Sequence, residues 1–393
     1  MTYTFHLASR YLLYHWKQTV VLILAYALVT GFPFIVSDFL QTFETNLYHR
    51  ASSTPMVIGS KGSKFDLSFH SLYFKGEVPG VLSSQVLSNI QSSGLASAIP
   101  LYLAHTAKGY PVVGTSLDYL TLRGLEVAQG HTMTSLGECV LGAAVAEKLS
   151  LQPGASLISD PESVFDLAGD YPLKMRVAGI LKPMGTADDQ AIFVDTKTAW
   201  VISGIGHGHE RVEEANQQTI LKDQGNHIVA NSALLHYNEI KADNRLSFHF
   251  HADAEDLPLT AVIAAPKDTK SSTLLRGRFL AASNPIQILI PSVVIEELFG
   301  IIFKVKTFFD LQTHLTLGAM ALLLSLIATL TFRIRAKERQ MLHSVGCPKG
   351  HVITIQILET LLVFLTGTIL AALGWVLARH FLHDVLMTRM IGL

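Results

Sequence analysis

Residues 18–37 read QTVVLILAYALVTGFPFIVS, an uncharged run that follows directly on Lys17. About 20 helical residues are needed to cross the roughly 30 Å of hydrocarbon in a bilayer. Two further uncharged runs, rich in Leu, Ile, Val and Ala, lie near the other end of the chain at residues 315–332 and 360–378. The sequence therefore predicts three transmembrane helices, one N-terminal and two C-terminal.

Basic residues are concentrated on one side of these runs. Arg10 and Lys17 precede the first run, and the segment between the second and third runs carries Arg333, Arg335, Lys337, Arg339 and Lys349. Because cytosolic loops of membrane proteins carry the excess of Lys and Arg, both segments are predicted to be cytosolic. The large segment between the first and second runs, and the C-terminal tail, then lie outside the cytoplasm.

A cleaved signal peptide is the alternative interpretation of residues 18–37. The apolar run is longer than the 7–15 residues of a usual signal core, and no small-x-small cleavage site follows it. We therefore expect an uncleaved anchor in a cytoplasmic (inner) membrane, with the N-terminus cytosolic.

The composition agrees with a protein that is partly in the membrane and partly in water. The 393 residues have a formal net charge of −1, a mean hydropathy of +0.36 and only 16% charged residues, whereas a soluble chain carries about 25%. No basic face or tail is evident, so nucleic acid is not an expected partner. Cys139 and Cys347 fall on opposite sides of the predicted membrane, and no disulfide framework is expected.

The segment outside the membrane is long enough for one large or two modest domains. Apolar stretches predict strands at residues 56–59, 112–114, 176–181, 191–194 and 260–265, and helical patterns occur at 83–92 and 142–149. Residues 291–310 have apolar positions at helical spacing but too many charges to span, so they predict an amphipathic stalk that continues into the second span. The expected fold is an α+β membrane protein, with three transmembrane helices flanking a large mixed α/β extracytoplasmic domain.

The predicted organisation has eight parts. They are a cytosolic N-terminal segment (1–17), a first transmembrane helix (18–37), the extracytoplasmic domain (38–290), the stalk helix (291–310), a second transmembrane helix (311–332), a cytosolic loop (333–356), a third transmembrane helix (357–379) and an extracytoplasmic tail (380–393).

Two histidine groups outside the membrane are candidate zinc ligands. His207, His209 and Glu210 lie in the polar stretch 206–224, which is expected to be an exposed loop, and His249 and His251 alternate along a probable strand. No cysteine assists them, and the two groups are far apart in sequence. We therefore expect no cofactor in this chain and keep zinc as the alternative.

Nothing in the sequence indicates an enzyme. Gly-x-Ser-x-Gly and His-Glu-x-x-His motifs are absent. Asp188 and Asp189 are adjacent carboxylates, but acidic pairs before a strand usually form a solvated turn, and we expect one here. Residues 59–64 (GSKGSK) lack the spacing of a Walker A loop, so any ATP hydrolysis must come from another subunit.

Residues 335–352 read RAKERQMLHSVGCPKGHV and resemble the cytosolic signature of FtsX/MacB-like ABC transporter permeases. The matching positions are Lys337, Glu338, Leu342, Gly346 and Glu359. Residues 112–120 (VVGTSLDYL), 140–149 (VLGAAVAEKL) and 176–185 (RVAGILKPMG) resemble the extracytoplasmic domain of the same permeases, in the same order. Such permeases usually have four spans, whereas this sequence predicts three.

The resemblance implies that the cytosolic loop is a coupling element that docks on a separate ABC ATPase, which binds the ATP. The residues it implicates are Lys337, Glu338, Arg339, Leu342, Gly346 and Glu359. A basic loop that only fixes topology is the alternative. Further implied partners are a second permease copy (as a homo- or heterodimer), membrane lipids and a periplasmic protein.

The expected function is that of a permease subunit. It would couple ATP hydrolysis by the ATPase to motion of the extracytoplasmic domain, for export, lipoprotein or lipid extraction, or mechanical signalling. The alternative is a membrane-anchored extracytoplasmic sensor or regulator without transport activity.

Overall fold

The computed structural model divides the chain into two units. It describes residues 2–77, 80–161, 172–208, 220–223, 228–230, 238–241, 243–250, 252–279, 285–334, 336, 340–341, 344–346 and 348–385. Unit 1 comprises residues 1–47 and 297–386, and the described part of unit 2 is Tyr48–Glu296. Each unit is considered by itself.

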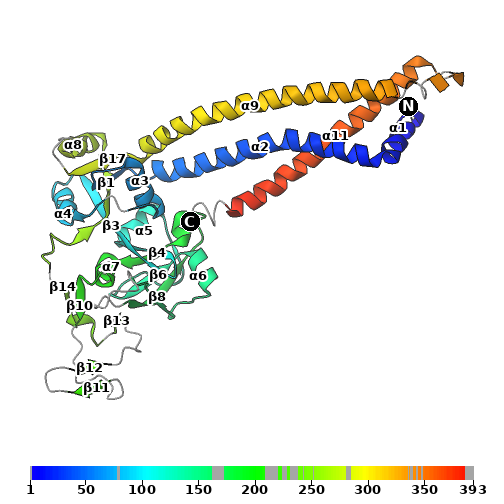
Figure 1. Ribbon diagram of the computed structural model, residues 1–393. Helices are drawn as coiled ribbons and strands as arrows, with labels where there is room; N and C mark the ends of the chain where they lie inside the picture. The colour runs from blue at the N-terminus through cyan, green and yellow to red at the C-terminus, as the bar shows by residue number, and fades with distance from the viewer. Residues whose placement is uncertain are drawn as a thin grey trace. The chain divides into compact units, whose positions relative to one another are not determined.

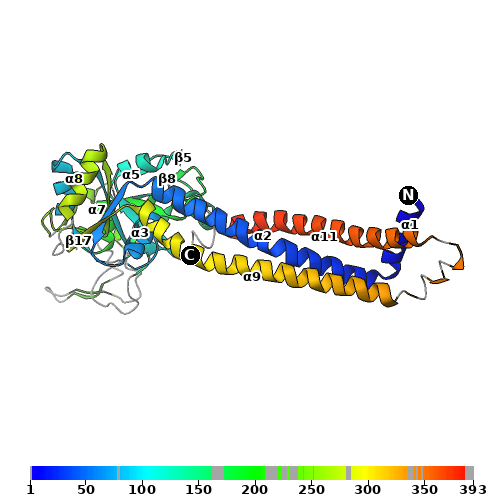
Figure 2. The ribbon, with the colours of Figure 1, turned by 90° about the horizontal axis from the view of Figure 1, so that it is seen from above.

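Unit 1 consists of helices, and the three long ones run alongside one another (Figures 1 and 2). Its elements are α1 (Thr2–Tyr14), α2 (Trp16–Ser52), α9 (Pro291–Ile334) and α11 (Lys349–Val385), of which α2 and α9 extend into unit 2. The predicted stalk and second span both fall on α9, which is a single continuous helix.

Helices α2 and α11 are parallel and in contact. Three residue pairs mark the contact: Tyr26 with Phe364, Gly31 with Ala371, and Asp38 with Arg379. The residue numbers rise together along both helices, which is the relation that a first and a third membrane span have when they cross in the same direction.

Two helices of the described residues are long and apolar enough to cross a membrane, by length and composition: Trp16–Ser52 and Gly350–His380. Only 11% and 6% of their apolar windows are buried, whereas the core helix of a soluble protein is mostly buried. The count of three spans stays a prediction.

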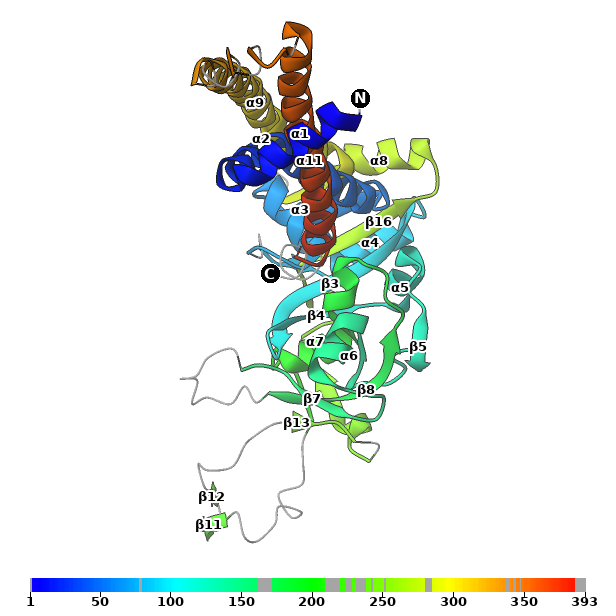
Figure 3. The same cartoon turned by 90° about the vertical axis from the view of Figure 1, so that its right-hand side faces the viewer.

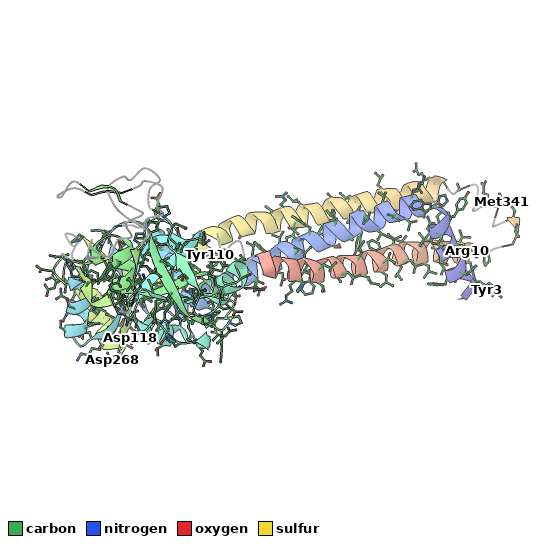
Figure 4. All side chains as sticks on the ribbon, turned by 90° about the horizontal axis from the view of Figure 1, so that it is seen from below. Tyr3, Arg10, Tyr110, Asp118, Asp268 and Met341 are labelled. Atoms are coloured by element: carbon green, nitrogen blue, oxygen red, sulfur yellow. The ribbon has the colours of Figure 1, made fainter. Side chains whose placement is uncertain are left out.

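Helix α1 packs against α11, and Ala8 of α1 is fully buried. Figure 4 shows Tyr3, Arg10 and Met341 at the same end of unit 1. Helix α1 and Met341 therefore lie at the same end of unit 1.

Unit 2 is built on a mixed sheet whose described strands follow the order β13-β8-β6-β9-β4-β3-β16-β1-β17, with β5 and β7 paired to β8. The strands are β1 (Met56–Ser60), β3 (Ala96–Ala107), β4 (Tyr110–Thr115), β5 (Val127–Gly130), β6 (Glu138–Leu141), β7 (Ser156–Ile158), β8 (Leu173–Leu181), β9 (Ile192–Asp195), β13 (Asn238–Glu239), β16 (Ala261–Pro266) and β17 (Ile286–Leu289). Smaller pairings join β2 (Leu82–Ser83) to β15 (Pro258–Leu259), β10 (Gly206–Gly208) to β14 (Phe248–Phe250), and β11 (Ile220–Asp223) to β12 (Ile228–Ala230).

Helices pack on both faces of this sheet. They are α3 (Lys64–Tyr73), α4 (Gln85–Ser92), α5 (Leu117–Arg123), α6 (Ala143–Leu149), α7 (Thr196–Ile202) and α8 (Thr269–Phe279), with 3-10 turns η1 (Ala187–Gln190) and η4 (Arg245–Ser247). Figure 3 shows α6 and α7 beside β4 and β8. Alternate residues of β1 face opposite ways, because Ile58 joins the core cluster that includes Ile90 of α4, whereas Gly59 lies against Leu67 of α3.

The predicted elements of this domain are confirmed. The five predicted strands correspond to β1, β4, β8, β9 and β16, and the two helical patterns correspond to α4 and α6. The polar stretch 206–224 was expected to be a loop, and this is wrong for its described ends, which form β10 and β11. Backbone hydrogen bonds between β10 and β14 satisfy the peptide groups of both strands. A polar composition does not reveal such pairing, because the pairing is made by the backbone.

Candidate functional site

The residues predicted to couple to an ATPase are described only in part. Lys337, Glu338, Arg339 and Leu342 lie outside the described residues. Gly346 has a φ of +94°, in the left-handed region that favours glycine, and it lies in a turn before α11. Glu359 lies on α11 and is buried. Their role in coupling stays a prediction.

The zinc prediction also stays untested. His207 of β10 and His249 of β14 are direct partners in the antiparallel register, so the fold brings these two positions together. His209, Glu210 and His251 lie outside the described residues. Within the described part of the chain, no three or more metal-ligating side chains gather.

The most developed polar site of unit 2 is one that the sequence did not predict. Arg50, in the last turn of α2, forms a bidentate ion pair with Asp188 of η1, with nitrogen–oxygen distances of 2.6 and 2.9 Å. The Tyr119 hydroxyl of α5 donates to the Asp188 carboxylate at 2.8 Å and accepts from Arg50 at 3.1 Å. We call these three residues the buried lock.

The lock is almost completely removed from solvent: Arg50 is 6% exposed, Asp188 1% and Tyr119 0%. Further hydrogen bonds reach both partners of the ion pair, since Arg50 Nε donates to the Leu72 carbonyl and Thr186 donates to Asp188. A buried ion pair is tolerated only when such additional hydrogen bonds satisfy both partners.

Aromatic rings complete the enclosure of the guanidinium. The Arg50 guanidinium carbon lies 5.8 Å from the centre of the Tyr73 ring and 5.7 Å from that of Phe74. Rings at this distance attract a cation through their electron-rich faces. The lock therefore joins the last turn of α2 to α3, α5 and η1 on one face of the sheet.

Both charges persist in this apolar setting. Burial disfavours the charge on Asp188, but the neighbouring Arg50 outweighs burial and lowers the pKa of the carboxyl below its usual range. Burial likewise opposes the charge on Arg50, whose pKa is nevertheless raised because Asp188 lies beside it. Burial, with Asp188 in support, raises the pKa of Tyr119 to about 12, so its hydroxyl stays a donor.

The expectation of a solvated turn at Asp188 and Asp189 is wrong for Asp188. Its side chain points into the domain because Arg50 and Tyr119 supply hydrogen bonds that replace water. Asp189 instead accepts from the backbone N–H groups of Met184 and Gly185, and so fixes the turn locally.

One known family matches more than half of the chain in sequence. The sequence model of the family described as the MacB-like periplasmic core domain matches residues 19–230. No curated protein matches the chain.

Two solved structures are similar to part of this chain. One is the periplasmic region of MacB from Actinobacillus actinomycetemcomitans, at 11% identity and a TM-score of 0.35, covering 63% of this chain and 93% of that one. The other is the extracellular domain of the noncanonic ABC-type transporter YknZ from Gram-positive bacteria, at 10% identity and a TM-score of 0.33, covering 60% of this chain and 98% of that one.

Proposed function

The chain belongs to the family of the MacB-like periplasmic core domain, and from this premise we propose that it is the membrane subunit of an ABC transporter. The family match and the apolar helix α2 together describe a membrane protein with an extracytoplasmic domain. In the proposed function, a separate cytosolic ATPase hydrolyses ATP and the chain carries the resulting motion to unit 2.

The observation that best supports this proposal is the way α2 ends. Helix α2 is one helix from Trp16 to Ser52, and its last turn carries Arg50, the cation of the buried lock. A displacement of this turn must carry η1 and α5 with it or break a buried ion pair, which costs about 3–5 kcal/mol. The lock therefore makes the last turn of α2 part of the core of unit 2.

The opposite end of the pathway would be the cytosolic loop. We assign ATPase docking to Lys337, Glu338, Arg339 and Leu342. Gly346 would provide the turn into α11, and Glu359 would complete the coupling residues where the apolar run of α11 begins. A push on this loop reaches α11, which contacts α2 in parallel through Gly31 and Ala371. Shifts of packed helices as rigid elements are a common form of such transmission.

Purification of the full-length protein in mild detergent tests the partnership. We expect an ABC ATPase to copurify, and we expect Glu338→Ala and Gly346→Pro to abolish this, because proline cannot adopt the positive φ of Gly346. Gly350→Ala is the control in the same segment, since a Cβ there meets no described atom within 4 Å. If no ATPase accompanies the wild-type protein, the sensor alternative is favoured.

Hydrogen exchange of the purified complex tests the mechanical role. A non-hydrolysable ATP analogue should change the exchange of α5 and η1 in the wild type, and Arg50→Lys should abolish that response because lysine cannot form the bidentate pair. Lys182→Gln, at an exposed surface pair, should keep it. A nucleotide response that survives Arg50→Lys would remove the lock from the mechanism.

A further inference from the structure

A charged cavity of about 480 Å³ lies at the β13 end of the sheet, away from the lock in sequence and in fold. It forms where β13 joins β8 in parallel, through Asn238 opposite Leu173 and Glu239 opposite Lys174. The ionisable residues that line it are Glu138, Lys174, Arg176, Glu239, Lys241 and Arg245. Four are cations and two are carboxylates, so the lining has a formal charge of +2 in a chain whose net charge is −1.

The two carboxylates of the cavity are already neutralised. Glu138, whose side chain is 5% exposed, pairs with Arg176 and accepts hydrogen bonds from the backbone and hydroxyl of Thr134 and the backbone of Ser135. Burial opposes the charge on Glu138, but these donors outweigh it and lower the pKa of the carboxyl. Glu239 pairs with Lys174 at 2.7 Å.

The other two cations have no comparable counter-charge among the described residues. Lys241 lies 4.0 Å from Glu239, whose carboxylate Lys174 already binds more closely. The Arg245 guanidinium donates to the neutral Ser135 hydroxyl at 2.8 Å, and no described carboxylate forms an ion pair with it. The rim therefore presents an ammonium and a guanidinium group with donors to spare.

The backbone that carries these two cations is held in place. The Asn244 side chain accepts from the Lys241 backbone N–H at 2.7 Å and donates to the Glu239 carbonyl at 3.0 Å. The Arg245 backbone N–H donates to the Lys241 carbonyl at 3.0 Å. These hydrogen bonds restrain the backbone at Lys241 and Arg245, which reduces the entropy lost when a ligand binds.

We infer that this cavity binds an anionic ligand through carboxylate or phosphate groups, with Lys241 and Arg245 as the recognising residues. A guanidinium matches the paired oxygens of either group, and an ammonium supplies a second point charge. A concave site with a net positive charge concentrates anionic solutes from solution. The volume lies within the roughly 300–1,000 Å³ of small-molecule sites. The inference does not depend on the ATPase partnership.

Calorimetric titration of the full-length protein in detergent, with inorganic phosphate, citrate and a penta-glutamate peptide as separate probes, tests the site. We expect at least one probe to bind, and Lys241→Gln with Arg245→Gln to weaken it about tenfold or more, as loss of charge-assisted hydrogen bonds implies. The control is Arg276→Gln with Arg278→Gln, two exposed cations of α8, which should leave the affinity within about twofold.

A variant that should bind the anion more tightly distinguishes a direct effect on binding from a folding defect. Glu239→Gln removes a carboxylate that competes with the ligand for Lys174 and Lys241, and it should tighten anion binding several-fold. Tightest binding of the peptide would identify an acidic protein segment as the ligand, whereas equal or tighter binding of citrate or phosphate would identify a small anion. Absence of binding by all three probes, or equal weakening by the α8 control, would overturn the inference.

Discussion

The two units place the same kinds of side chain in opposite surroundings. Val57 and Ile263, on adjacent strands of unit 2, are both fully buried. Leu28 of α2 and Leu377 of α11, in unit 1, are 68% and 71% exposed. In water such exposure would be unfavourable over whole helices, but in lipid it costs nothing, because the acyl chains are as apolar as leucine. The difference indicates that each unit is built for a different solvent.

The units also differ in how their parts are held together. Unit 2 combines burial of apolar surface with a buried ion pair, Arg50 with Asp188, at a place where water is excluded. In unit 1 the apolar windows of α2 and α11 are only 11% and 6% buried, and the two helices approach closely where Gly31 of α2 lies against Ala371 of α11. Small residues serve this purpose in membranes, where association depends on packing and hydrogen bonds.

The largest expected effect comes from breaking the lock. Arg50→Ala leaves the Asp188 carboxylate buried without its cation and should lower the free energy of unfolding of unit 2 by about 3–5 kcal/mol. Urea-induced unfolding of the full-length protein, followed by pulse proteolysis, measures the change. Lys182→Ala, in a pair whose two side chains are exposed, should cost less than about 1 kcal/mol.

The same experiment can separate the cost of the unpaired charge from the cost of lost side-chain packing. Arg50→Met combined with Asp188→Leu removes both charges and should recover most of the stability lost in Arg50→Ala, since paired apolar replacements are often neutral. A double variant as unstable as Arg50→Ala would mean that the loss of stability comes mainly from the packing of the arginine side chain and not from the unpaired charge.

The second effect tests the solvent of unit 1 directly. Leu28→Arg places a charge on an exposed position of α2 and should cost about 2.5–3.5 kcal/mol if that position lies in the bilayer centre. Leu117→Arg, at a 49% exposed position of unit 2, should change stability by less than about 0.5 kcal/mol. The fraction of protein retained in membranes after alkaline extraction compares the two variants: retention should fall for Leu28→Arg and stay at the wild-type level for Leu117→Arg, and equal retention would contradict the comparison.

The third effect concerns two buried histidines of unit 2. Burial lowers the pKa of His70 and of His105 to about 4 in each case, against about 6.5 in an unfolded chain. Between these two pH values the two histidines bind more protons in the unfolded state than in the folded state. The stabilisation is therefore complete above about pH 6.5 and is lost as the pH falls toward 4, by about 2–3 kcal/mol for each histidine.

Urea midpoints of the full-length protein from about pH 7 to pH 4 measure this loss. His70→Gln should make the stability of unit 2 less dependent on pH over this window. His131→Gln, at an exposed position, is the control and should leave the wild-type dependence in place. An unchanged slope in His70→Gln would show that its proton uptake is not linked to unfolding.

Much of the fold could be predicted because its signals are local. The apolar run of residues 18–37 is dictated by bilayer thickness, which requires an uninterrupted stretch. The strands β1, β4, β8, β9 and β16 were found because each is a short apolar run closed by turn residues.

The lock could not be predicted, because its partners are 138 residues apart and neither has a local motif. Aspartate and arginine are mostly exposed, so a pattern-based reading places Asp188 in a solvated turn. Only the packing of η1 and α5 against the end of α2 brings the three side chains together. The same holds for the cavity, whose Glu138, Glu239 and Arg245 come from separate segments.

The smallest expected effect concerns the close packing of α11 against α2 in unit 1. Two glycines of α11 differ in their neighbours: a Cβ at Gly367 would lie 2.5 Å from Tyr26 of α2, whereas a Cβ at Gly374 meets no described atom within 4 Å. Alanine at either position gains about 1 kcal/mol of helix propensity. Gly374→Ala should therefore stabilise the helices, but Gly367→Ala should destabilise them by about 1 kcal/mol, because overpacking outweighs the propensity gain.

Thermal unfolding of the detergent-solubilised protein, followed by helix content, measures the two glycine variants side by side. Since the substitutions are identical and lie on one helix, propensity cancels between them and the difference reports the contact with Tyr26 alone. Equal stabilisation by both variants would mean that α2 and α11 do not pack closely where Gly367 faces Tyr26. The proposed transmission from α11 to α2 would then have no close contact at Tyr26 to act through.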